Sequence, residues 1–223
     1  MDLRGRYYGY FEVHFMFNAC GFLLSGIWFG LNIFAGIITK RLKMQWLSYF
    51  NALFASIIPV FIIASTLGIY PVQNNGLHNV TVFIVSIATV VITSAIVTRK
   101  KSIIRRKGKE LLFWGLDGLL MEIPQRLMMQ SFIYGILSLS DVSSSNLYAV
   151  MVTALVWCLG ILMQAFLLKT RFDKELAIDI AASFVFSLGM GYVYQETGLI
   201  VISMIAHFCE RVLSYSVFVN EHS

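Results

Sequence analysis

Hydrophobic and polar positions along the chain fall into long apolar runs separated by short polar segments. Seven runs are long enough to cross a bilayer, because about 20 apolar residues of helix span its hydrocarbon core. The predicted spans are 13–38, 46–70, 79–98, 110–138, 146–168, 176–194 and 199–218. The runs are continuous rather than alternating, which favours helices over the strands of an outer-membrane barrel. We therefore predict an all-α polytopic membrane protein, a bundle of seven or eight transmembrane helices.

The first span is unusually long and holds Asn18 and Asn32, so splitting it would give the eighth helix. We expect residues 1–109 to form about three N-terminal transmembrane helices and residues 110–223 to form a core of four. The chain is 58% hydrophobic and 13% charged, with a net charge of +5. Because the basic residues cluster between apolar runs, the charge indicates membrane loops and not nucleic-acid binding. The lipid bilayer is the expected partner.

Basic residues predict the orientation in the membrane. They occupy alternate loops: Lys40, Arg41 and Lys43; Arg99, Lys100, Lys101, Arg105, Arg106, Lys107 and Lys109; Lys169, Arg171 and Lys174. The positive-inside rule places these loops in the cytoplasm, with the N-terminus outside and the C-terminus inside, in the plasma membrane if the source is prokaryotic. Arg4 and Arg6 argue against this for the N-terminal end. The 99–109 loop either sets topology or also contacts anionic lipid, at about 1 kcal/mol per basic residue.

One predicted span, 110–138, carries an unusual set of polar residues for a membrane helix. Its central stretch, LDGLLMEIPQRLMMQ, holds Asp117, Glu122, Pro124, Gln125, Arg126 and Gln130. A charged side chain at bilayer depth costs roughly 2.5–3.5 kcal/mol on insertion scales. Glu122 and Arg126 are four residues apart, so we expect them to share a helix face and pair. Pro124 lacks an N–H and is expected to kink the helix.

A second polar set lies in the last predicted span, where His207, Glu210 and Arg211 share a helix face. Glu122 lies roughly 20 Å beyond Lys109, and His207 roughly 12 Å beyond Leu199 from the other side. These depths together match the ~30 Å hydrocarbon thickness, so the two residues can meet at one level. The sequence predicts a polar pocket there, either a functional site or an ion-pair network that only holds helices together.

Metal and serine chemistry are weakly supported. A catalytic zinc site needs about three protein ligands, whereas Glu122 and His207 supply two, and Arg126 and Arg211 beside them repel a cation. Ser131 and Ser203 are available as nucleophiles, but nothing in the sequence places either against His207. We expect no metal and no cofactor.

Three segments resemble the CAAX-protease and bacteriocin-processing (CPBP, or Abi) family of intramembrane proteases. The family signature is a Glu-Glu-x-x-x-Arg helix, a Phe-x-x-x-His helix and a late His-x-x-x-Asn helix. Residues 121–126, MEIPQR, are similar to the first motif, and residues 153–161, TALVWCLGI, to the middle helix. Residues 191–207, GYVYQETGLIVISMIAH, match the late segment without a gap. The resemblance covers roughly residues 110–215 and implies a CPBP-type fold.

The matched motifs also show replacements. Met121 stands at the first glutamate, Trp157 at the phenylalanine, Ile161 at the middle histidine and Arg211 at the late asparagine. The resemblance implies catalytic roles for the residues that are retained, which are Glu122, Arg126 and His207. Further candidates for the site are Asp117, Gln125, Glu210 and Arg211.

Two hypotheses follow, and they differ in whether a competent base lies near His207. The first is a weakly active or noncatalytic homologue whose cavity binds a peptide or a membrane-protein partner, for example a bacteriocin-like peptide. The alternative is an active glutamate-dependent endopeptidase that processes prenylated or bacteriocin-like peptides. Met121 and Ile161 cannot take a proton from water, so a base would have to be Glu122, which Arg126 pairs, or Asp117 on the Met121 face. A transporter or channel part is a third class.

Overall fold

The computed structural model describes residues 79–100, 106–139, 142–167 and 171–216, with Lys169 and a few isolated positions between 30 and 42. Every regular element within these residues is helical, which confirms the predicted all-α class. The predicted spans 13–38 and 46–70 lie almost wholly outside the described residues, so the total of seven spans stays a prediction.

Three of the described helices are long and apolar enough to cross a membrane. They are α3 (Val80–Val97), α6 (Ser145–Leu167) and α7 (Lys174–Thr197). Large apolar side chains are exposed along α3 and α6, among them Ile84, Ile87, Val91, Leu155, Leu159 and Phe166. Apolar side chains on the outside of a bundle are stable against lipid, so these faces agree with an integral membrane protein.

Local sequence signals set the ends of α7 and bring the chain back into the bundle. The Asp173 carboxylate accepts hydrogen bonds from the Glu175 and Leu176 N–H groups and so caps the first turn. Gly198 ends the helix at φ 69°, a left-handed conformation that glycine adopts without strain. The chain then reverses at once into α8 (Ile200–Ser216).

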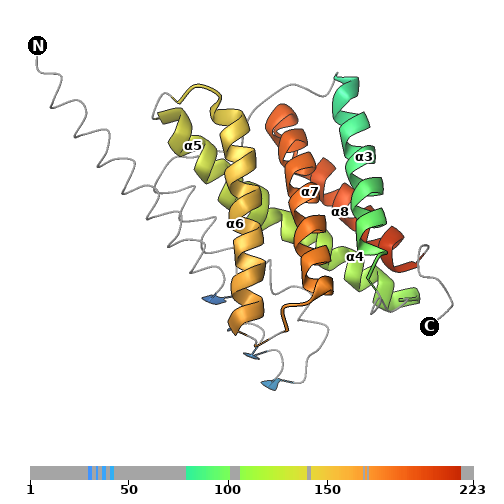
Figure 1. Cartoon of the computed structure of the whole chain (residues 1–223). Coiled ribbons are helices and arrows are strands. Elements are labelled where there is room, and N and C mark those ends of the chain that lie inside the picture. The colour runs from blue at the N-terminus through green and yellow to red at the C-terminus, as the bar shows by residue number, and fades with distance from the viewer. Residues whose placement is uncertain are drawn as a thin grey trace, which may run out of the picture.

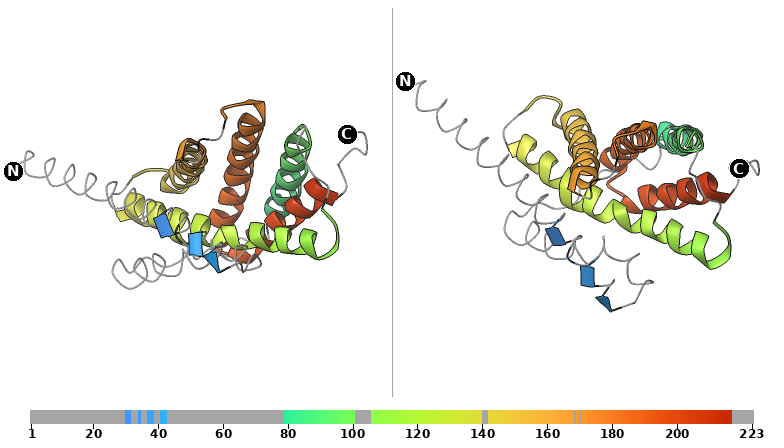
Figure 2. Two further views of the ribbon diagram at one scale, coloured as in Figure 1. Left: turned by 90° about the horizontal axis from the view of Figure 1, so that it is seen from below. Right: turned by 60° about the horizontal axis from the view of Figure 1, so that its bottom comes forward.

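The predicted span 110–138 is a continuous helical rod built from three elements. These are α4 (Gly108–Glu122), a π-helix η3 (Ile123–Gln130) and α5 (Ser131–Leu139). Figures 1 and 2 show the rod running obliquely across α6 and α7. Pro124 is the second residue of the π-helix, where we expected a kink. The Leu120 carbonyl, which an α-helix would pair with the missing N–H of Pro124, accepts the Ile123 N–H instead.

Several helix ends lie on the same side of the molecule. In Figure 1, α3 and α6 end, α4 and α7 begin and α8 ends on the lower side of the molecule. The N–H of Arg106 donates to the Tyr215 carbonyl at 3.1 Å, which fixes the start of α4 against the end of α8. The helix ends that flank residues 101–105 and 168–170 thus lie on one side, while the topology and its assignment to the cytoplasm stay predictions.

The apolar core lies where α3, α7 and α8 meet. It consists of Val82, Val90, Phe186, Met190, Val193 and Ala206. Gly189 lets α7 approach α3 closely, since a Cβ there would lie 2.0 Å from Thr89 Oγ1. Small residues at such contacts are typical of membrane helix packing. The α3–α7–α8 unit supports the polar face of the rod.

Candidate functional site

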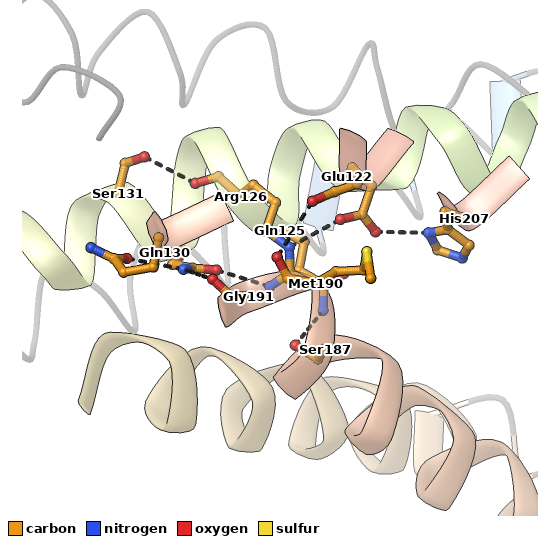
Figure 3. Close-up of polar contacts among 11 residues, drawn as sticks. Glu122, Gln125, Arg126, Gln130, Ser131, Ser187, Met190, Gly191 and His207 are labelled. Carbon is orange, nitrogen blue, oxygen red and sulfur yellow. Dashed lines mark hydrogen bonds and ion pairs between the residues drawn. The ribbon is translucent and has the colours of Figure 1, made fainter. Parts of the chain in front are cut away.

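The π-helix turns the polar side chains of the rod toward α7 and α8. Glu122, Arg126 and Gln130 follow one another at intervals of four residues and are fully buried on the same face (Figure 3). The Ser131 backbone N–H donates to the Arg126 carbonyl, five residues earlier, and the Ser131 hydroxyl donates to the same carbonyl at 3.0 Å. A five-residue span is the spacing of π-helical hydrogen bonds, and such segments are frequent at functional sites.

Glu122 is the centre of the polar cluster. One carboxylate oxygen, Oε2, accepts a hydrogen bond from Arg126 Nε at 3.0 Å, and the other, Oε1, lies 2.7 Å from His207 Nδ1. Both oxygens are therefore occupied, and the residue has no exposed surface. The predicted pairing of Glu122 with Arg126, and the predicted meeting of Glu122 and His207 at one depth, are both confirmed.

The cluster continues away from His207 as a chain of hydrogen bonds. Arg126 Nη1 donates to Gln130 Oε1 at 2.9 Å, and Gln130 Nε2 donates to the Gly191 carbonyl at 2.8 Å and to Gln195 Oε1 at 3.1 Å. Gln195 Nε2 in turn donates to Asn146 Oδ1 at 3.0 Å. The polar core thus links the rod to α7, and through Asn146 to the start of α6.

His207 presents its second nitrogen away from the carboxylate. Because Glu122 accepts at Nδ1, that nitrogen carries the proton, and Nε2 of a neutral ring is left as an acceptor. Figure 3 shows Nε2 pointing away from Glu122. A carboxylate that orients a histidine in this way is the arrangement by which histidine serves as a general base or as a positioned hydrogen-bond donor.

A cavity of about 360 Å³ lies beside this polar core. His207 lines it together with Met121, Trp157, Ile161 and Arg211, which are the positions matched to the three family motifs. These residues come from α4, α6 and α8, so the fold brings the three sequence segments to one place. The side chains at two of the positions, Met121 and Ile161, offer neither a proton acceptor nor a donor.

Charged residues line the cavity farther from the polar core. Lys100 Nζ bonds both carboxylate oxygens of Asp179 at 2.9 Å. Glu210 is 4% exposed and accepts a hydrogen bond from the Ser214 hydroxyl at 2.7 Å. Arg211 Nε lies 4.0 Å from Glu210 Oε2, the outer limit of an ion pair. The cavity lining therefore includes the apolar side chains of Met121 and Ile161 as well as charged side chains, Lys100, Asp179, Glu210 and Arg211.

Two glycines make the close approach of the helices possible at this site. A Cβ on Gly118 would lie 2.7 Å from Arg211 Cγ and 3.0 Å from His207 Cδ2. A Cβ on Gly191 would lie 3.2 Å from both Arg126 Nη1 and Gln130 Oε1. Glycine at these positions lets α8 and α7 pack against the rod closely enough for the polar contacts to form.

The remaining predicted residues are placed differently. Asp117 is half-buried and is not among the residues that line the cavity. The cavity lining therefore does not support the hypothesis that Asp117 acts as the base. Gln125 lines the cavity, and its Nε2 donates to Ser187 Oγ at 2.8 Å. The Ser131 hydroxyl lies 2.9 Å from Tyr194 Oη, and Ser203 Oγ donates to the Met190 carbonyl at 3.4 Å, so neither is bonded to His207.

Several contacts were not foreseen from the sequence, namely those of Asn146, Ser187, Gln195 and the Lys100–Asp179 pair. Gln130 follows Arg126 by four residues, so the helical spacing carried a usable signal for that contact. The other partners are distant in sequence, and no local pattern indicates them. Among the described residues, no group of three His, Cys, Asp or Glu side chains is arranged to hold a metal ion.

The same segment matches a known protein family. Residues 107–213 match the model of the type II CAAX prenyl endopeptidase Rce1-like family. The match begins just before α4 and ends within α8, so the matched segment contains the whole polar core and most of the cavity lining. It confirms the resemblance to the CPBP proteases. No curated protein and no solved structure matches the chain.

Proposed function

We propose that this integral membrane protein is a noncatalytic or weakly active member of the CPBP type, which uses its cavity to bind a peptide segment or a membrane-protein partner. The observation that carries the proposal is the apolar cavity wall at Met121 and Ile161. The resemblance implies a water-activating glutamate at position 121 and a histidine at position 161. Met121 and Ile161, which stand there instead, line the same cavity as His207.

Loss of the base is decisive for the rate of peptide hydrolysis. General-base assistance is typically worth 10²–10⁴-fold. Glu122 is the retained glutamate, but Arg126 and His207 occupy both of its oxygens. A paired, fully buried carboxylate is poorly placed to take a proton from water. The cavity has the size of a ligand-binding pocket, and its lining combines apolar side chains with polar and charged ones.

One observation favours a second candidate function, residual peptidase activity. His207 is oriented by the Glu122 carboxylate at 2.7 Å, and its ring also lines the cavity. His207 Nε2 would then act as the base, while Arg211 would donate to the developing oxyanion. Each candidate function gives Glu122, Arg126 and His207 a different role. In the binding protein they support the cavity, and in the peptidase they take part in catalysis.

Cleavage of membrane-tethered peptides separates the two candidates. We expect the natural protein, reconstituted in lipid, to give no more cleavage than His207→Ala. The combined variant Met121→Glu with Ile161→His, with and without Arg211→Asn, restores the family residues and is expected to raise cleavage above that background. Cleavage by the natural protein that His207→Ala abolishes would show that the peptidase candidate is right and the noncatalytic one wrong.

Site-specific photo-crosslinking tests binding directly. A photoreactive amino acid at Ile161 is expected to capture a peptide or protein in cells, because this side chain lines the cavity. The matched control is Leu159 on the same helix, which is 56% exposed and faces outward. Equal capture from the two positions would contradict binding within the cavity.

A further inference from the structure

At the charged end of the cavity, two arginine side chains contact the indole ring of Trp114. The guanidinium carbon of Arg106 lies 4.3 Å from the centroid of Trp114, and that of Arg211 lies 4.6 Å from the same centroid. Tyr215 meets Trp114 edge-on, with the ring centroids 5.3 Å apart. Arg106 and Arg211 are distant in sequence, so the packing of α8 against α4 creates this basic cluster.

The acidic partners of the cluster leave part of its hydrogen-bonding capacity unused. Arg106 pairs with the exposed Glu110, Arg211 Nε lies 4.0 Å from Glu210 Oε2, and the Arg211 charge also interacts with the Asp117 carboxylate. Arg106 Nε and Trp114 Nε1 are buried N–H donors with no hydrogen-bond partner among the residues that the structure describes. A buried donor without an acceptor is unusual in a native protein and calls for an explanation such as a bound ion or ligand.

The position of the cluster indicates the kind of ligand. Trp114, Arg211 and Tyr215 line the cavity from α4 and α8. The start of α4 and the end of α8 lie on the lower side of the molecule in Figure 1. The lining of the same cavity also includes apolar side chains, among them Val97, Ala182 and Phe186. Tryptophan, tyrosine and arginine together are typical of the level of lipid headgroups. A ligand that matches both parts has an anionic head and an apolar tail.

We propose that the cluster of Arg106, Trp114 and Arg211 binds the phosphate of an anionic phospholipid, one of whose acyl chains enters the cavity. Arginine forms paired, planar hydrogen bonds with phosphate, and the Trp114 N–H supplies a further donor. Basic pockets between membrane helices bind lipid headgroups by the same chemistry. The proposed phosphate contact does not use Glu122, Arg126 or His207, but it shares Arg211 and the cavity with the site described above.

Electron paramagnetic resonance of spin-labelled lipids measures the preference directly. The full-length protein is reconstituted in phosphatidylcholine vesicles, and the association of spin-labelled phosphatidylglycerol is compared with that of spin-labelled phosphatidylcholine. The natural protein should prefer phosphatidylglycerol. Arg106→Gln and Arg211→Gln should each reduce the preference about fivefold, as expected for a basic residue that contacts an anionic headgroup. The matched control, Lys107→Gln with Lys109→Gln, removes two exposed charges from the same end and should change it much less.

Two outcomes would overturn the proposal. One is a control variant that loses as much preference as the arginine variants, since this would mean a diffuse surface charge and no site. The other is inorganic phosphate displacing the lipid at equal concentration, because the site would then recognise a bare anion. If the glutamine variants fail to fold, Arg106→Lys with Arg211→Lys keeps the charge but removes the planar donors. This variant should lose most of the preference, and full retention would refute the phosphate contact.

Discussion

The two sides of this site have opposite characters although they share a turn of helix. Glu122 belongs to a dry polar core in which both carboxylate oxygens are bonded, whereas Met121, the preceding residue, lines a cavity. In the polar core, Glu122, Arg126 and His207 are the residues that the family resemblance implies at these positions. On the second side the positions matched to its activating glutamate and middle histidine are apolar.

The contrast separates what holds the helices from what performs chemistry. A buried charge without its partner is strongly destabilising, so the polar core cannot lose one member alone. A residue on a cavity wall has few packing partners on one side and can change with little loss of stability. Retention of Glu122, Arg126 and His207 therefore does not by itself indicate catalysis.

The largest expected effect comes from breaking the polar core. Arg126→Ala should reduce the unfolding free energy by about 3–5 kcal/mol, because it leaves the Glu122 carboxylate buried and uncompensated. Adding Glu122→Gln should recover part of this loss. Unfolding by sodium dodecyl sulfate titration in mixed micelles, followed by far-ultraviolet circular dichroism, measures both. A double variant whose loss equals the sum of the single losses would show that the two residues are not coupled.

The Arg106–Glu110 pair is a useful control because it has the same four-residue spacing in an exposed setting. Exposed ion pairs typically contribute about 0–1 kcal/mol. Glu110→Gln should therefore lower stability far less than Glu122→Gln in the same titration.

Gln130→Leu is expected to be the next most damaging change. It removes the acceptor of Arg126 Nη1 and the donor to the Gly191 carbonyl, at about 1–3 kcal/mol for a buried polar group left unpaired. Gln164→Leu, at an exposed position of the cavity lining, is the matched control and should fall within about 0.5 kcal/mol of the natural protein. Similar losses in the two variants would mean that the hydrogen-bond chain adds no stability.

Gly118→Ala tests the boundary between the two sides. Its methyl group would press on Arg211 Cγ and His207 Cδ2, and such overpacking costs about 1–3 kcal/mol. Alanine regains about 1 kcal/mol of helix propensity, so we expect a small net loss. Thermal unfolding measures it, and a net gain in stability would show that α8 moves away without cost.

Met121→Gln should have the smallest effect. The side chain is half-buried on the cavity wall, where an added amide remains able to reach water. We expect a change within about 0.5 kcal/mol, against a loss of several kcal/mol for a change at its neighbour Arg126. A large loss at Met121 would contradict the division into a core side and a cavity side.

The sequence predicted most of what depends on spacing along one helix. The apolar runs gave α3, α6 and α7, and the four-residue interval gave the Glu122–Arg126 pair. The estimate of depth also brought His207 to Glu122, because helical rise is constant and both spans begin at recognisable ends.

Contacts between helices were harder to foresee. Which face of α7 meets Gln130, and whether Asp117 reaches the cavity, depend on the rotation of each helix about its axis. The π-helix changes the rotation of the rod about its axis. Pro124 is the sequence signal within this segment, and a proline in a helix predicts a kink and not a π-helix. The pairing of Lys100 with Asp179 likewise depends on how α3 packs on α7.

The π-helix also bears on how this domain tolerates changes of length. Because a π-helix uses one more residue in each hydrogen-bonded ring than an α-helix, the 123–130 segment holds surplus chain. A one-residue deletion there can be absorbed by tightening toward an α-helix, whereas the same deletion within α4 would rotate everything after it by about 100°. The 123–130 segment is thus the part of the rod where the helical register can change by one residue.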